Sequence, residues 1–135
     1  RSPVLGYLFD NFKLPNPYVP TVAIDTDDVF ERKIDMVHCH ASQFYEWLPF
    51  NGGRLDDVPE SDVERRAWLA ESLHRRFGAL ADSTRETLAR WYGEERAAQI
   101  RTAESVSISE YGRGLSAEEI PVMFPFFPAA KEQDG

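Results

Sequence analysis

Two histidines flank the only cysteine of the chain, and this arrangement raises the question of a metal site. His38, Cys39 and His40 lie in a stretch with helical periodicity. On a helix, residues two apart point about 200° away from each other, so His38 and His40 do not share one ion. Ligands on one helix need spacings of three or four: Asp35 has such a spacing from His38, whereas Glu46 lies too far from His40. We therefore expect no metal ligands and no complete metal site in this chain.

Three polar side chains of the same stretch fall on one side of the expected helix. Lys33, His40 and Gln43 are separated by seven and three residues, which are close to whole turns. Polar groups beside an apolar stripe need partners where the helix packs, either in the body of the protein or at a ligand cleft. The plainest interpretation of His40 is a histidine at the edge of the core, bonded to a neighbouring element. Ser42 lies on another face, where its hydroxyl meets solvent or bonds back to the helix.

Aromatic residues gather at the end of this stretch, just before a flexible loop. Tyr45, Trp47 and Phe50 precede Asn51-Gly52-Gly53. These side chains frame a substrate mouth or belong to the core, and the core is the commoner place for aromatic residues at helical spacing. The chain contains no P-loop, no Rossmann glycine fingerprint, no Gly-x-Ser-x-Gly and no His-Glu-x-x-His. The residues alone indicate no catalytic group.

The composition excludes several classes of function. The net charge of −8 repels phosphate backbones and anionic lipid surfaces, which argues against nucleic-acid and membrane-surface binding. No apolar run approaches the roughly 20 residues of a membrane span, and the first residues are not those of a signal peptide. A single cysteine fits a reducing compartment. We expect a cytoplasmic protein, and a start at Arg1 running directly into a strand suggests a fragment or a processed chain.

The elements that must position these side chains are three short strands and several helices. Strands are predicted at Val4–Phe9, Thr21–Asp25 and Val106–Ser109. Capping boxes predict further helices from Ser61, from Ser116 and, as an alternative to one continuous helix, from Ser83. Gly93 is a predicted helix stop, and a short helix is expected from Glu94 to Ile100. The face of the helical region after Ser61 is expected to consist of Leu69, Leu73, Phe77 (or Arg76), Leu80, Leu88 and Trp91.

The best-defined helix is predicted between Asp28, with Glu31 as its capping-box partner, and Leu48. Its apolar residues recur at steps of four and three: Phe30, Ile34, Val37, Ala41, Phe44 and Leu48. Such a period is typical of a helix that buries one face. Residues 1–128 are expected to form one region, and residues 129–135 a disordered tail.

The motif residues resemble a known family. Ile24-Asp25-Thr26, then Lys33, then His40-Ala41-Ser42-Gln43 resembles the C-terminal portion of the PIG-L/LmbE-like de-N-acetylases. The tail, from Arg101-Thr102-Ala103-Glu104 through Ser109-Glu110-Tyr111-Gly112-Arg113 to Phe124-Pro125-Phe126, resembles the end of bacterial members of that family. The similarity covers the chain from about Pro3 to Phe126.

The resemblance implies a zinc-dependent amidohydrolase (a hydrolase acting on an N-acetylated sugar or similar amide) with a Rossmann-like α/β fold. The family's His-Pro-Asp-Asp-Glu motif, with two zinc ligands and the general base, and its later histidine motif are both missing here. They belong in a half that precedes Arg1, so Zn²⁺ is expected in the complete enzyme, with its ligands outside this chain. Lys33, His40, Ser42 and Gln43 match the family's downstream motif, and the resemblance implies only that they fix this helix against the catalytic half.

Three hypotheses follow. In the first, the chain is the C-terminal part of a deacetylase and is inactive alone. Its catalytic half is another segment or chain, and the exposed edge of the Val4–Phe9 strand extends the sheet of that half. In the second, it is a non-catalytic interaction module derived from that family. In the third, it is a small helical protein with an accidental likeness. A homo-oligomer is compatible with all three.

Overall fold

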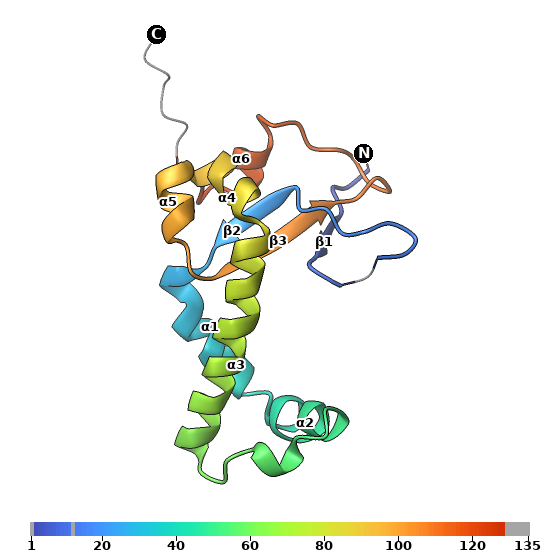
Figure 1. The fold of residues 1–135 in the computed structure, drawn as a ribbon. Helices are drawn as coiled ribbons and strands as arrows, with labels where there is room; N and C mark the ends of the chain where they lie inside the picture. The colour runs from blue at the N-terminus through green and yellow to red at the C-terminus, as the bar shows by residue number, and fades with distance from the viewer. Residues whose placement is uncertain (1, 12, 129–135) are drawn as a thin grey trace.

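A small antiparallel sheet forms the centre of the structure, a computed structural model that describes residues 2–11 and 13–128 (Figure 1). Three strands lie in the order β1 (Gly6–Leu8), β3 (Ala103–Ile108) and β2 (Val22–Asp25), and helices account for most of the rest of the described chain. The predicted α/β class, mostly helical with a few short strands, is confirmed. The parallel strand pairing of a Rossmann-like sheet is not found among these strands, because β3 runs antiparallel to both of its neighbours. The predicted tail at 129–135 lies outside the described residues.

The three predicted strands are confirmed with shifted ends. They are β1 (Gly6–Leu8), β2 (Val22–Asp25) and β3 (Ala103–Ile108). Val22 and Ala23 of β2 are fully buried, whereas all three residues of β1 are exposed. The central strand β3 therefore holds together one buried strand and one strand that is open to solvent.

The long helix predicted from Asp28 to Leu48 is wrong as a single element. It divides into a 3-10 turn η1 (Asp27–Val29), α1 (Phe30–His38), a π-helical segment η2 (Ser42–Trp47) and α2 (Leu48–Asn51). Cys39 and His40 separate α1 from the π-helical segment. The predicted capping box is also wrong, because no side chain caps α1 and the Glu31 carboxylate binds Arg66 of helix α3 (Asp62–Ser83) instead.

The apolar stripe predicted on that helix is confirmed only in part. Phe30 and Ile34 are buried, and Val37 and Phe44 are half-buried against the same cluster, but Ala41 and Leu48 are exposed. The register is lost at the break after α1, since the chain changes direction there. Tyr45, which the stripe did not include, is buried instead, in a cluster formed with Phe30, Ile34, Leu69 and Leu73.

After the 3-10 turn η3 (Leu55–Asp57), α3 (Asp62–Ser83) is the longest helix of the described chain. Its N-cap is Ser61, whose hydroxyl oxygen accepts from the Glu64 backbone N–H at 3.3 Å, as predicted. The helical region then divides at Thr84, which confirms the two-helix alternative. Thr84 donates its hydroxyl to the Leu80 carbonyl at 2.8 Å and does not cap the next helix.

Two short helices and a terminal turn complete the fold. α4 (Arg85–Tyr92) and α5 (Glu94–Gln99) meet at Gly93, whose φ of 80° favours glycine and ends α4 as predicted. The predicted box at Ser116 is confirmed, since the Ser116 N–H donates to the Glu119 carboxylate at 3.0 Å, ahead of α6 (Ile120–Met123). No helix in the described part of the chain is long and apolar enough to cross a membrane.

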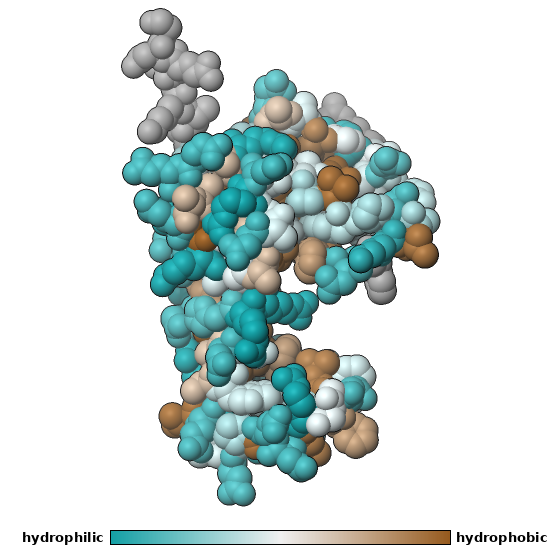
Figure 2. Space-filling model, viewed as in Figure 1, coloured by the Kyte–Doolittle hydropathy of each residue, from teal (hydrophilic) through white to brown (hydrophobic). Residues whose placement is uncertain are grey.

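Helix α3 connects two ends of the molecule (Figure 1). Its second half packs against β3 at the end that holds the sheet, α4, α5 and α6. Its first half packs against α1, and α2 lies at that same end. Between the two ends the surface is hollowed on one side (Figure 2).

Candidate functional site

Lys33 joins helix α1 to the sheet. Its ammonium forms an ion pair with Glu104 of β3 and lies 3.8 Å from the centre of the Phe77 ring of α3. Burial lowers the pKa of the Lys33 ammonium below its ordinary value, and the positive charge of Arg76 lowers it further. A cation held by a carboxylate and an aromatic face serves as an anchor between elements.

His40, Ser42 and Gln43 do not share the surroundings of Lys33. All three are exposed, and within the described chain their side chains make no hydrogen bond or ion pair. The prediction that His40 and Gln43 lie with Lys33 at the core edge is wrong, because it required one continuous helix. The backbone carbonyl of His40 instead accepts from the N–H groups of Gln43 and Phe44, both at 3.1 Å, and starts the π-helical segment.

Ser42 and Gln43 line an open groove on the π-helical segment and α2. The groove has a volume of about 660 Å³, and its other lining residues are Glu46, Trp47, Phe50 and Leu55. Trp47 and Phe50 are 57% and 69% exposed, so both side chains are accessible to a ligand in the groove. Tyr45, in contrast, is part of the core. Hydroxyl, amide and carboxylate groups thus lie beside two aromatic faces, a combination suited to a polar ligand or to another protein surface.

A polar chain that the sequence did not reveal holds this segment in place. Nδ1 of His38 lies 2.6 Å from the Tyr45 hydroxyl, and Nε2 lies 3.3 Å from the Asp62 carboxylate. Since a carboxylate only accepts, the ring donates from Nε2 to Asp62, and in the neutral tautomer this leaves Nδ1 to accept from the Tyr45 hydroxyl. Burial raises the pKa of Tyr45, and the negative charge of Asp62 raises it further. The seven-residue spacing of His38 and Tyr45 was the available signal, but it was obscured by the assumption of a straight helix.

The histidines of the chain do not assemble a metal site. His38 uses both ring nitrogens on Tyr45 and Asp62, His40 is exposed, and the ring of His74 lies against Phe30 with centroids 4.6 Å apart. Within the described residues, no group of three or more His, Cys, Asp or Glu side chains is placed to hold an ion. These residues do not fit the zinc centre that the resemblance implies, and the location of its ligands outside this chain stays a prediction.

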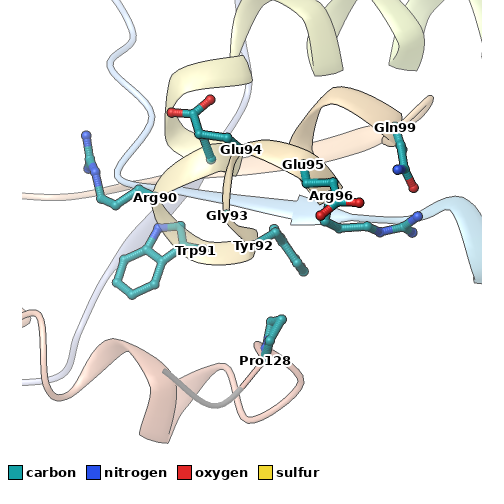
Figure 3. A pocket seen from close by; sticks show the side chains of 10 residues that line it. Arg90, Trp91, Tyr92, Gly93, Glu94, Glu95, Arg96, Gln99 and Pro128 are labelled. Carbon is teal, nitrogen blue, oxygen red and sulfur yellow. The ribbon is translucent and has the colours of Figure 1, made fainter. Parts of the chain in front are cut away.

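A second hollow surrounds Gly93, where α4 meets α5 (Figure 3). It has a volume of about 570 Å³, and both acids and bases line it, including Arg90, Glu94 and Arg96. Arg96 already donates from Nε to the Asp25 carboxylate at 3.0 Å. Burial raises the pKa of Tyr92, which also lines this hollow, but the acids and bases there offset one another in charge. We therefore regard this hollow as a weaker candidate than the groove.

Comparisons of the chain with protein-family models, with curated proteins and with solved structures found no match.

Proposed function

We propose that this chain is the C-terminal part of a zinc-dependent N-deacetylase that hydrolyses the N-acetyl group of an amino sugar or a similar amide. The resemblance of the Lys33 and His40-x-Ser42-Gln43 motif to the PIG-L/LmbE-like family supports the proposal. One structural observation also supports the proposal. The chain's own fold uses Lys33 of this motif, but leaves the side chains of His40, Ser42 and Gln43 exposed and without hydrogen bonds in the described residues. Such groups are available to a second body.

The small antiparallel sheet is compatible with this role. In the proposal, the Rossmann-like parallel layer belongs to the metal-holding half, and the three strands described here are an addition at its edge. The Lys33–Glu104 ion pair then fixes α1 on β3. The helix break at Cys39–His40 separates the π-helical segment from α1. In the proposal, that segment lies against the other half.

When bound in the complete enzyme, zinc would polarise the amide carbonyl and activate water, while a carboxylate of the other half takes the proton. The residues of this chain have a different task. Lys33 and Glu104 hold the helix on the sheet, and His40, Ser42 and Gln43 offer donors and acceptors that orient the metal-holding half. None of them is assigned as a zinc ligand or as the base.

The test is His40→Ala in the complete enzyme, with zinc content, melting temperature and deacetylation measured together. We expect lower stability or activity with zinc retained, because a buried partner left without its hydrogen bond costs about 1–3 kcal/mol. In the isolated chain the same substitution should leave melting unchanged, since His40 is exposed there. Loss of the metal would make His40 a ligand, and no change in any of the three measurements would exclude a role for it.

A non-catalytic interaction module is the second candidate, favoured by the exposed apolar groups around the groove. Trp47, Phe50 and Leu55 together present more apolar surface than isolated surface residues do. The reading frame upstream of Arg1 and the intact mass of the natural product separate the two candidates. A natural product that begins near Arg1 and has no catalytic half would favour the module.

A further inference from the structure

Strand β1 is an edge strand whose outer side is open. Tyr7 lies opposite Ser107 of β3, and the Ser109 N–H donates to the Leu5 carbonyl at 2.8 Å. Backbone groups alternate in direction along an antiparallel strand, so Leu5 and Tyr7 face β3. The N–H and C=O groups of Gly6 and Leu8 therefore point away from the sheet. Within the described residues no partner strand lies on that side (Figure 1).

The side chains of β1 are as open as its backbone. Tyr7 is 52% exposed and Leu8 is 70% exposed, although both are large and apolar. An exposed apolar edge is a template for pairing with another strand, and proteins normally cover or charge such edges. Because β1 itself carries neither a charge nor a proline, nothing on the strand prevents another strand from pairing with it.

A hollow with a cationic wall adjoins the end of β1. Leu8, Phe9, Arg76 and Phe77 line a cavity of about 150 Å³ between the strand and the middle of α3. Arg76 is exposed, with its guanidinium carbon 5.8 Å from the centre of the Phe77 ring. No carboxylate of the described chain forms an ion pair with Arg76; Glu104, which lines the same cavity, pairs with Lys33.

Charge decides between two occupants of this surface. A second copy of the chain would bring another net charge of −8 to the contact, and the two copies would repel. A partner that carries a carboxylate beside its edge strand would instead complement Arg76 locally. The cation near an open edge thus fits a distinct protein body better than a homodimer.

We propose that the outer edge of β1 and Arg76 form a docking surface for the edge strand of another α/β body, with a carboxylate beside that strand pairing with Arg76. This inference rests on the proposed function, in which that body is the metal-holding half. Backbone hydrogen bonds supply the affinity of such strand addition, and the Arg76 pair supplies register and specificity.

The first experiment measures binding by calorimetry. Its probe is the polypeptide encoded directly upstream of Arg1 in the same reading frame, produced as a separate chain. Arg76→Glu should weaken binding about tenfold or more, whereas Arg75→Glu, on the same helix and outside the hollow, should change it less than about twofold. Of the backbone hydrogen-bonding groups, Leu8→Pro removes only an outward N–H, and it should also weaken binding. Leu8→Ala likewise loses the leucine side chain but keeps that donor, so it should bind more tightly than Leu8→Pro.

The second experiment measures amide hydrogen exchange residue by residue. In the isolated chain the amides of Gly6 and Leu8 should exchange fast and that of Tyr7 slowly; in the complex all three should exchange slowly. The docking surface would be overturned if Arg76→Glu bound as tightly as the parent, or if exchange at Leu8 did not change on binding. It would also be overturned if no such half were encoded upstream of Arg1, or if the chain self-associated through β1. Docking with these signatures in a complex that lacks zinc and deacetylation would instead overturn the proposed function alone.

Discussion

Asp27 has a largely buried carboxylate that accepts several hydrogen bonds from another segment of the chain. Its side chain is 7% exposed and accepts from the Thr102 N–H and the Thr102 hydroxyl, both at 2.8 Å. The Arg101 N–H also donates to it, at 3.1 Å. Burial acts to raise the pKa of this carboxyl, but the hydrogen bonds from Arg101 and Thr102 outweigh burial, and the pKa is lowered below its ordinary value. This carboxylate ties the turn before α1 to the start of β3.

The lowered pKa predicts how stability depends on pH. Because the folded pKa of Asp27 lies below the unfolded value, its contribution is present above the unfolded value of about 3.9 and is lost as the pH falls through the folded pKa. Asp27→Asn should lower the free energy of unfolding at pH 7 by about 1–3 kcal/mol. It should also flatten the acid decline, as followed by denaturant titration from pH 7 to pH 2. Asp28→Asn, at an exposed neighbour, is the control and should behave like the parent. If the stability of Asp27→Asn and of the parent fell equally as the pH was lowered, Asp27 would not be a cause of the loss of stability in acid.

At the scale of elements, the loop after β3 depends on Gly112, which lies close to the backbone before β1. A Cβ at Gly112 would lie 2.6 Å from the Pro3 carbonyl oxygen and 3.0 Å from the Leu5 nitrogen. Both are backbone atoms, so the chain before β1 must shift to accept alanine. Gly112→Ala should therefore destabilise the protein by about 1–3 kcal/mol, the usual cost of overpacking.

Thermal melting and amide exchange at Arg113 test this prediction, because the Arg113 N–H donates to the displaced Pro3 carbonyl. The control is Gly114→Ala, since a Cβ there meets no atom within 4 Å. If both substitutions melt alike, the close approach at Gly112 does not contribute to stability.

Local signals predicted most elements, and long-range pairing explains the rest. The Ser61 and Ser116 capping boxes and the Gly93 stop were predictable because each depends on residues within one turn. The break after α1 was not, since apolar spacing alone continues through it. His38 bonds to Tyr45 and Asp62, and these contacts accompany a chain direction that no local pattern encodes.

The same limit applies to the candidate site. The residue types of the Lys33 and His40-x-Ser42-Gln43 motif were recognisable from the sequence, but their surroundings were not. Lys33 pairs with Glu104, 71 positions away in sequence, and the seven-residue spacing to His40 gave no sign of that contact. The exposure of His40 and Gln43 follows from the break after α1, so an error in one element moved two predicted site residues from the core edge to the surface.

At the scale of the whole molecule, the open surfaces belong to different elements. The edge of β1 and the groove on the π-helical segment and α2 are both exposed, although each carries large apolar side chains. The hollow between the two ends of α3 lies on one side of the molecule (Figure 2). A second body seated against this side would cover apolar surface worth about 25 cal/mol per Å². If the proposed metal-holding half is such a body, stability should therefore rise when it is present.

The last prediction concerns zinc in the isolated chain. One ion needs three protein ligands with compatible geometry, whereas His38 is already bonded at both ring nitrogens, His40 is exposed and His74 lies on another helix. We expect metal analysis of the purified chain to find no stoichiometric zinc, and melting to be the same with and without a chelator. The complete enzyme that we propose would provide the contrast, since there the chelator should lower the melting temperature by removing a ligand bound only to the folded state. Tight one-to-one zinc in the isolated chain would place the metal centre among the residues described here and would overturn the division of roles between the two halves.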